Sequence, residues 1–376
     1  MTDNDLIQIS RETINIVKDF EKTALQGLES VNLSWCIYLH LGMTQFDTLD
    51  SVITLLEKGR HKDCFVLLRS VFESSFFLIL MMRGKRFRET RRFKVIPNAN
   101  EDSRTARDKT LAIWEQNRKF GKPNYDKIVN LGKEDEDIIL VTIEDEGLYT
   151  KEDVKKEGPV ISRYYFAFDE YDPETRFTSK LPSVSAGNPY PEIADEQWIK
   201  QKTIYHQYFY ISKLKKNLKL NGLLDNEQAD RFEVHYNFLS AFVHPTKMGT
   251  SRIGEKTYSH PYTPPVMRFA RHELILLYIC KLQALLIRVL VDFFERVNQK
   301  SNFEKYKKKV AHIDAMTKDF WFIYNEPTAF DKSKSEYLKK VAADLGHTVD
   351  AAVILYYRNP LKRLADLLIA QGKISP

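Results

Sequence analysis

The sequence predicts a mainly α-helical fold: an antiparallel helical bundle with an irregular, partly β insertion and a helical C-terminal extension. Apolar residues recur at spacings of three and four along most of the first third of the chain, as in Leu33, Ile37 and Leu41, which is the period of a helix with one buried face. Hydrophobic residues make up 43% and aromatic residues 12% of the 376 positions, enough for a packed interior. Prolines gather between residues 121 and 196, where the helical pattern stops.

Residues 1–120 are predicted to form the N-terminal helices of the bundle. Helices are expected over residues 6–28, 33–57, 61–82 and 104–119. Gly59 and Gly84 stand at expected helix ends, because glycine commonly follows the last helical residue. Only a short connection separates the second helix from the third, so these two are expected to run antiparallel.

Residues 121–196 are predicted to form the insertion. An acidic run lies at residues 134–137, and two β-prone segments follow at residues 138–143 and 160–168. We therefore expect irregular chain with one small hairpin or sheet.

Residues 197–300 are predicted to return to the bundle. A helix over residues 197–220 should break at Asn221-Gly222, and Asp225 and Gln228 have the spacing of a capping box for the next helix. That helix is expected to end at His244, because Pro245 disfavours the helical conformation of the residue before it. A long apolar helix is expected over residues 265–299.

Residues 301–376 should hold two or three further helices, one of them over residues 350–370. Composition leaves open whether this extension is a separate domain or part of the bundle.

Charge and cysteine usage favour a cytoplasmic protein without a cofactor. The formal net charge is +6, a small excess that permits nucleic-acid binding without requiring it. Cys36, Cys64 and Cys280 are far apart and form no CxxC pair, so we expect neither disulfides nor structural zinc. The start of the chain is polar and acidic, unlike a secretory signal. The most apolar stretch, residues 64–82, contains Arg69 and Glu73 and is expected to be a core helix that does not enter a membrane.

Two helices carry polar residues among apolar ones. The sequence contains no GxGxxG, P-loop, HExxH or GxSxG motif. This absence argues against nucleotide hydrolysis, zinc proteolysis and α/β-hydrolase chemistry. Arg69 and Glu73 lie four residues apart on one helical face, and a charge there needs a partner. Tyr236, Ser240 and His244 repeat the four-residue spacing on a later helix, and a histidine at a helix C-terminus is favoured in its protonated form.

If these two helices pack together, Arg69, Glu73, Ser240 and His244 would converge. Such a cluster suits RNA cleavage without a metal, with His244 moving protons, Arg69 stabilising a pentavalent phosphate and Glu73 orienting either of them. The same residues equally suit a structural network that tethers one helix to the other. Both interpretations stay open at this point.

A basic stretch follows the apolar helix directly. Its expected RNA-binding residues are Arg83, Lys85, Arg86, Arg88, Arg91 and Arg92. Cations at this density could follow a phosphate backbone, or they could simply form a solvated connector.

The Arg-x-x-x-Glu helix and the later Ser-x-x-x-His-Pro helix end resemble a family of bacterial helical proteins of unknown function. That family is in turn similar to the HEPN superfamily (higher eukaryote and prokaryote nucleotide-binding). The resemblance covers roughly residues 33–290, apart from the insertion. It implies a metal-independent ribonuclease that forms a homodimer. The role that it implies is that of a toxin or of a protein in defence against phage. HEPN ribonucleases carry an Arg that is followed by a His. The nearest such pair in this chain is Arg231 and His235, and its spacing is one residue too short for that pattern.

The function expected is a HEPN-like effector directed at RNA, either an endoribonuclease or a degenerate RNA-binding relative. The alternative is a non-catalytic scaffold or sensor subunit that binds a partner protein of the same system. A bundle that binds a small molecule or nucleotide in a closed pocket near Tyr236 is a third interpretation.

Overall fold

The computed structural model describes residues 3–28, 33–84, 86–92, 136–144, 160–162, 211–243, 265–325, 328–344 and 359–374. The described chain is mainly α-helical, as predicted. Its contacts divide into two compact units. The first unit comprises Met1–Val31, Leu39–Leu78 and Asp225–Pro376, and the second comprises Asn32–Tyr38 and Ile79–Leu224. The C-terminal extension therefore belongs to the same unit as the N-terminal helices, which composition had left open.

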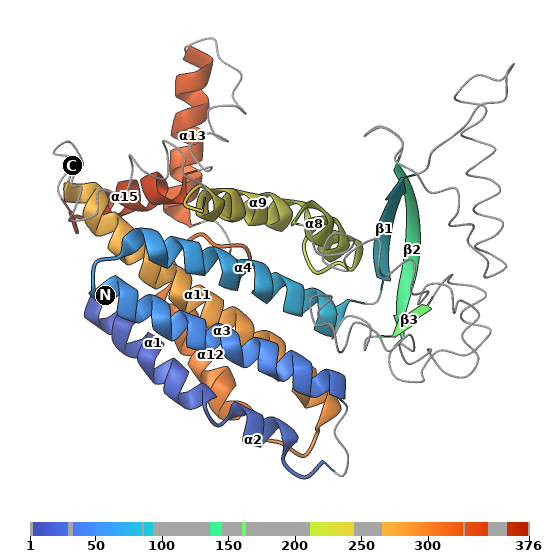
Figure 1. Ribbon diagram of the computed structural model, residues 1–376. Coiled ribbons are helices and arrows are strands. Elements are labelled where there is room, and N and C mark those ends of the chain that lie inside the picture. Colours follow the sequence, from blue (N-terminus) through green and yellow to red (C-terminus); the bar gives the residue numbers. More distant parts are fainter. Residues whose placement is uncertain are drawn as a thin grey trace, which may run out of the picture. The chain divides into compact units, whose positions relative to one another are not determined.

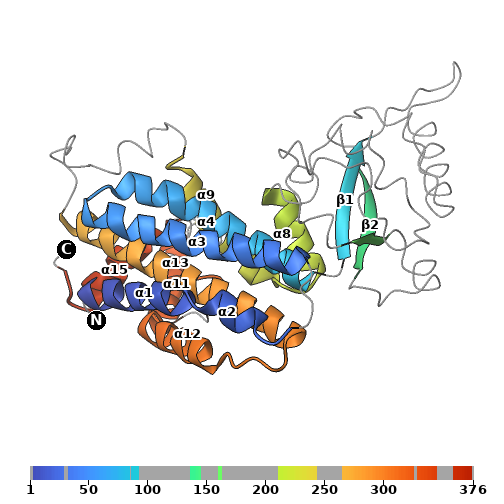
Figure 2. The same ribbon diagram turned by 60° about the horizontal axis from the view of Figure 1, so that its bottom comes forward.

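The first unit is a helical bundle built around α11. Its main helices are α1 (Asp3–Val17), most of α3 (Leu33–Glu57), most of α4 (His61–Arg83) and α11 (Pro265–Val297), which run alongside one another in both views (Figures 1 and 2). Residues 33–38 of α3 and 79–83 of α4 are assigned to the second unit. Gly42 allows α3 to approach α11 closely, because a Cβ atom at this position would lie 3.0 Å from a methyl carbon of Leu290.

Helices α3 and α4 match the predicted ranges within one residue. The turn between them needs Gly59, which has a φ of 71°. The amide of Gly59 donates to the carbonyl of Leu56, and the amide of Arg60 donates to that of Leu55. These two bonds form a Schellman motif, which closes α3 and reverses the chain into α4.

The prediction of a single helix over residues 6–28 was wrong. The chain forms α1 and then a short α2 (Phe20–Leu25), with a break at residues 18 and 19. Phe20 is completely buried, with its ring centroid 4.8 Å from that of Tyr306 and 5.6 Å from that of Phe303. The break places Phe20 in this aromatic cluster, and this packing outweighs the helical preference of residues 18 and 19.

Helix α9 (Asn226–Ser240) begins with the predicted capping box. The Asp225 carboxylate accepts a 2.8 Å bond from the Gln228 amide, and the Gln228 side chain accepts a 3.0 Å bond from the Asp225 amide. The predicted end at His244 was wrong, because a tight turn follows Ser240. This turn buries Phe242, whose ring is stacked on Phe65 at 4.4 Å.

The second unit contains a small sheet and one further helix. The strands are β1 (Arg86–Arg92), β2 (Glu136–Glu144) and β3 (Val160–Ser162). β1 pairs antiparallel with β2, and β2 pairs parallel with β3. Helix α8 (Ile211–Leu220) lies beside β1 (Figures 1 and 2). It ends at Leu220 as predicted, closed by Gly222 with a φ of 66°. Of the other predicted elements, residues 104–119 and 197–210 lie outside the described chain.

The extension contributes three described helices to the first unit. They are α12 (Glu304–Met316), α13 (Ala329–Asp344) and α15 (Pro360–Ala370). Both α12 and α15 pack on α11. The described part of the predicted helix over residues 350–370 is α15, which begins at Pro360 with its first turn capped by Asn359.

Two described helices are long and apolar enough to cross a membrane, over His61–Arg83 and Phe269–Val297. Their most apolar windows are 61% and 94% buried inside the protein. The burial of Phe269–Val297 is that of a core helix, because nearly all the surface that lipid would cover is packed inside the protein. More than half of the His61–Arg83 window is covered in the same way.

Candidate functional site

Arg69 of α4 is the centre of a polar cluster between α4 and α9. Its Nη2 atom donates to the Tyr236 hydroxyl at 2.8 Å, and its Nε atom donates to the Ser240 hydroxyl at 3.4 Å. The same Nη2 lies 3.1 Å from the Glu73 carboxylate. The guanidinium carbon also lies 5.3 Å from the centre of the Tyr236 ring, in cation–π range. The predicted convergence of Arg69, Glu73 and Ser240 is therefore present in the structure.

The local sequence explains why these side chains meet. Residues four apart on a helix share one face, so Glu73 lies over Arg69 and Ser240 lies over Tyr236. Between the two helices, aromatic contacts fix the packing: Phe232 of α9 lies 5.3 Å from Phe72 of α4, measured between ring centroids. The polar pairs are thus held at the edge of an apolar seam.

The cluster is only partly buried. The Arg69 side chain is 28% exposed and that of Glu73 is 12% exposed, while Tyr236 and Ser240 have intermediate exposure. An arginine held by three partners and still reached by water has a fixed orientation and an accessible edge. Such a group can orient an anion, and it can equally fasten two helices together. His244, the predicted proton carrier, lies outside the described residues.

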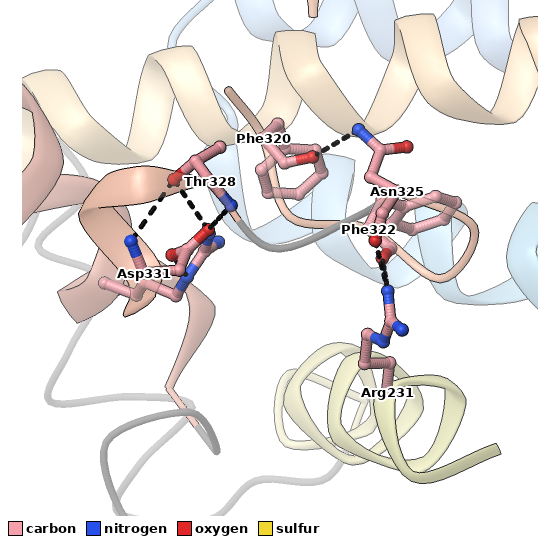
Figure 3. Close-up of polar contacts among 7 residues, drawn as sticks. Arg231, Phe320, Phe322, Asn325, Thr328 and Asp331 are labelled. Carbon is pink, nitrogen blue, oxygen red and sulfur yellow. Dashed lines mark hydrogen bonds and ion pairs between the residues drawn. The ribbon is translucent and has the colours of Figure 1, made fainter. Parts of the chain in front are cut away.

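Arg231 and His235, the nearest pair to the HEPN spacing, face the C-terminal extension. Arg231 donates to the backbone carbonyls of Phe322, at 3.4 Å, and Asn325 (Figure 3). Its guanidinium also lies over the Trp321 ring. His235 shares a 2.7 Å hydrogen bond with the Tyr278 hydroxyl. Burial, and after it the nearby charge of Arg363, lower the pKa of His235 to about 3. A histidine buried and neutral in this way holds the core together and is no proton carrier at neutral pH.

The segment around residues 320–325 was not recognised from sequence. Besides the Arg231 contacts, Asn325 donates to the Phe320 carbonyl at 3.0 Å (Figure 3). Asn325 also accepts from the buried Lys281 at 3.2 Å. The next turn is closed by Thr328 and Asp331, and Asp331 pairs with Arg363 of α15. These partners come from segments far apart in the sequence, and an irregular loop has no periodicity that would have signalled them.

A histidine pair at the start of α4 was also missed. The rings of His61 and His272 lie 5.9 Å apart, edge to face. Burial lowers the pKa of His61 to about 4, and the positive charges of His272 and Arg271 add to the effect. His61 lies on α4 and His272 lies on α11. No spacing in the sequence indicates that these two helices meet at this point.

The predicted RNA-binding residues that the structure describes lie on two consecutive elements, α4 and β1. Arg83 is exposed at the end of α4. Arg86, Arg88, Arg91 and Arg92 lie in β1, a strand paired with β2. Lys85 lies outside the described residues.

Metal-ligating side chains do not gather in the described part of the chain. No group of three or more His, Cys, Asp or Glu residues there could hold a metal ion. Cys64 and Cys280 are buried as single thiols, and Cys36 is partly buried.

Comparison with protein families matches residues 35–259 to a family of unknown function, DUF5677. This region is more than half of the chain. The protein belongs to the DUF5677 family. The comparisons with curated proteins and with solved structures found no match.

In this DUF5677 protein the matched region contains all four members of the polar cluster, Arg69, Glu73, Tyr236 and Ser240. It also contains the sheet and α8. Helices α12, α13 and α15 lie beyond it, so the family region includes the cluster but not the extension that Arg231 and His235 contact.

Proposed function

We propose that this DUF5677 protein is a HEPN-like effector directed at RNA, and that the Arg69 cluster is its site of metal-independent endoribonuclease action. The observation that carries the proposal is the meeting of Arg69 and Glu73 from α4 with Tyr236 and Ser240 from α9 at a partly exposed position. We further propose a HEPN-like bundle with a partly β insertion, acting as a homodimer in the cytoplasm, as a toxin or in defence against phage.

The proposed chemistry uses the RNA as its own nucleophile. The 2′-hydroxyl attacks the adjacent phosphorus, and the bond from phosphorus to the 5′-oxygen of the next nucleotide breaks. His244, four residues beyond Ser240, accepts the proton of the 2′-hydroxyl and returns a proton to the leaving oxygen. Arg69 stabilises the charge of the pentavalent phosphate, with Glu73 and Tyr236 fixing its orientation. The products are a 2′,3′-cyclic phosphate and a 5′-hydroxyl.

Cleavage of total RNA and of tRNA by the purified full-length protein in EDTA tests the proposal. We expect fragments that end in a 2′,3′-cyclic phosphate, with His244→Ala and Arg69→Ala each lowering the rate by about a hundredfold or more. The matched controls are His312→Ala and Arg11→Ala. His312 is exposed on α12, and Arg11 is 54% exposed in a surface ion pair with Glu57.

Folding must be checked for every variant by circular dichroism and thermal unfolding. If Arg69→Ala and His244→Ala stay folded and cut RNA as fast as the wild type, the cluster is not the nuclease site. Absence of cutting by the wild type, at any RNA tried, contradicts the enzymatic proposal.

A second candidate function is a non-catalytic scaffold or sensor that binds a partner protein. It is favoured by the number of contacts that Arg69 makes between α4 and α9, which is what a helix tether requires. In that case Tyr236→Phe should lower the free energy of unfolding by about 1–2 kcal/mol. The same change in an Arg69→Met background should cost little, because the bond is already absent. The control is Tyr337→Phe, on a tyrosine that is 60% exposed.

A further inference from the structure

The hydroxyls of Tyr236 and Ser240 each have a proton that their bonds to Arg69 do not use. Both hydroxyl oxygens accept from Arg69, at 2.8 Å and 3.4 Å respectively, because a guanidinium has donors only. A hydroxyl carries a single proton, which stays available when its oxygen accepts. In the part of the chain that the structure describes, no acceptor lies within hydrogen-bond range of either hydroxyl. Each of the two can therefore donate to a bound ligand.

Arg69 also orients the two hydroxyls. An O–H group that accepts a bond from a cation turns its own proton away from that cation, because the two positive charges repel. The donating atoms, Nε and Nη2, are neighbours in one planar guanidinium. Tyr236 and Ser240 are about one turn apart on the same face of α9. The two protons are thus close enough together for one ligand group, and the cation behind each O–H bond makes it a stronger donor.

Aromatic packing fixes the position of the Tyr236 hydroxyl from its other side. The Tyr236 ring is stacked on that of Phe232, with an interplanar angle of 9° and centroids 6.4 Å apart. Phe232 is buried and packs against Phe72 and Phe76 of α4. A donor held by a cation at one end and by a buried ring along its face loses little freedom when a ligand binds, and this preorganisation favours binding.

Glu73 limits the negative charge that a ligand can bring to these donors. Its carboxylate lies 3.1 Å from Nη2 of Arg69 and offsets the charge of the guanidinium. A group with two negative charges is repelled by this carboxylate more strongly than a group with one. An internal phosphodiester of a nucleic acid has a single negative charge, whereas a phosphomonoester carries about −1.5 to −2 at pH 7. The charge of the cluster therefore favours a diester.

We propose that Tyr236 and Ser240 bind the non-bridging oxygens of a phosphodiester through their hydroxyl protons, and that Glu73 makes this site prefer a diester to a phosphomonoester. Tyr236 then contacts the substrate directly, in addition to orienting Arg69. That the diester belongs to RNA rests on the proposed function. The two donors and the charge preference rest on the contacts of the cluster alone.

Isothermal titration calorimetry of the full-length protein with two uncleavable ligands tests the site. The diester is a uridylyl-uridine dinucleotide whose attacking 2′-hydroxyl is methylated, and the monoester is uridine 3′-monophosphate, at about pH 7.5 where the monoester is doubly charged. The variants are Tyr236→Phe, Ser240→Ala and Glu73→Gln. The matched controls, all at exposed positions, are Tyr337→Phe, Ser51→Ala and Glu57→Gln, the last in the surface ion pair with Arg11.

We expect the wild type to bind the diester more tightly than the monoester. Tyr236→Phe should weaken diester binding by roughly tenfold, and Ser240→Ala, whose bond to Arg69 is longer, by about threefold or more. Glu73→Gln should strengthen monoester binding more than diester binding, because it removes the repelling charge. The controls should change either affinity by less than about twofold. Circular dichroism and thermal unfolding check that each variant is folded, and a purely structural role would change stability without changing these affinities.

A wild type that binds neither ligand, or that binds the monoester as tightly as the diester, would overturn the inference. So would wild-type diester affinity in folded Tyr236→Phe and Ser240→Ala. If the wild type binds the methylated dinucleotide through these hydroxyls but leaves RNA intact, the nuclease proposal fails and the diester site stands. If the wild type cuts RNA and both hydroxyl variants keep its kcat/KM, the diester site is wrong and the nuclease proposal stands.

Discussion

Arg69 and His235 show how the same kind of position, a polar residue in an apolar helix, leads to two different environments. Arg69 stays partly exposed and is held by charged and hydroxyl partners. His235 is buried, and its hydrogen bond to Tyr278 satisfies the ring while burial keeps it neutral. The difference arises from what lies over each residue. The edge of the α4–α9 seam borders Arg69, and the C-terminal extension covers His235.

The sequence predicted the Arg69 cluster because each half of it is local. Arg69 with Glu73, and Tyr236 with Ser240, are four-residue pairs that helical geometry places on one face. A charge on an apolar helix needs a partner. Glu73 can supply it within α4, so the meeting of the two halves depended on the packing of α4 against α9. The environment of His235 could not be predicted in this way, because Tyr278 and the loop at residues 320–325 are distant in sequence.

The partly buried His61 and the buried His235 make stability depend on pH. The folded-state pKa values of His61 and His235, about 4 and about 3, lie below the ordinary value of 6.5. Below pH 6.5 the unfolded chain therefore binds protons that the folded chain does not, and the free energy of unfolding falls as the pH is lowered. Above pH 6.5 this stabilisation is complete. Each histidine contributes a slope of up to about 1.4 kcal/mol per pH unit within its window.

Urea unfolding at about pH 7 and about pH 5 measures this slope. Between the two pH values, the free energy of unfolding of His61→Gln should fall by about 1–2 kcal/mol less than that of the wild type. The difference is kept to this size because His61 is only partly buried. The free energy of unfolding of His312→Gln, which changes an exposed position, should fall by as much as that of the wild type. A wild-type stability that is the same at both pH values would contradict the burial argument.

Helix boundaries were predictable where the signal is local and failed where packing decides. The capping box at Asp225 and Gln228 and the glycines at 59 and 222 appear as expected, because a cap is formed by residues within one turn. The break between α1 and α2 and the early end of α9 were missed. Phe20 and Phe242 cause them by entering aromatic clusters that the local sequence does not reveal.

Helices α13 and α15 depend on one buried ion pair. Arg363 and Asp331 are 5% and 1% exposed, respectively, and the guanidinium also stacks on Trp321, 4.9 Å from the ring centroid. Breaking a buried pair from one side leaves an uncompensated charge, whereas replacing both partners by apolar residues removes that cost. We therefore expect Arg363→Met to lower the free energy of unfolding by about 3–5 kcal/mol.

The double variant Arg363→Met/Asp331→Leu tests the cause. Its stability in urea should exceed that of Arg363→Met by about 1–3 kcal/mol, although Asp331→Leu also removes the two hydrogen bonds that the carboxylate accepts from Thr328. Lys334→Met/Asp366→Leu, at a partly exposed pair between the same two helices, should change stability by less than about 1 kcal/mol and serves as the matched control. A double variant as unstable as Arg363→Met alone would show that the loss comes from packing of the Arg363 side chain.

In the whole molecule, the extension completes the core of the first unit. Phe303, Tyr306, Ile313, Phe320 and Phe322 are all buried. Burying a large apolar side chain stabilises a fold by about 1.5–3 kcal/mol, so loss of this set would remove a large share of the packing that stabilises the first unit. Composition could not reveal this, because an appended domain and a core segment have the same residue content.

A chain ending at residue 300 should therefore fail to fold cooperatively, although it contains the whole family region and the Arg69 cluster. Removal of the extension exposes the faces of α11 that α12 and α15 cover, and it leaves Arg231 and His235 without the loop at residues 320–325. Thermal unfolding and size-exclusion chromatography of the truncated chain measure the effect. Co-expression of residues 301–376 as a separate polypeptide should restore a soluble complex, because the contacts are side-chain contacts that need no covalent link. A truncated chain that unfolds cooperatively, with the stability of the full-length protein, would show instead that the extension is an appendage to a bundle already complete.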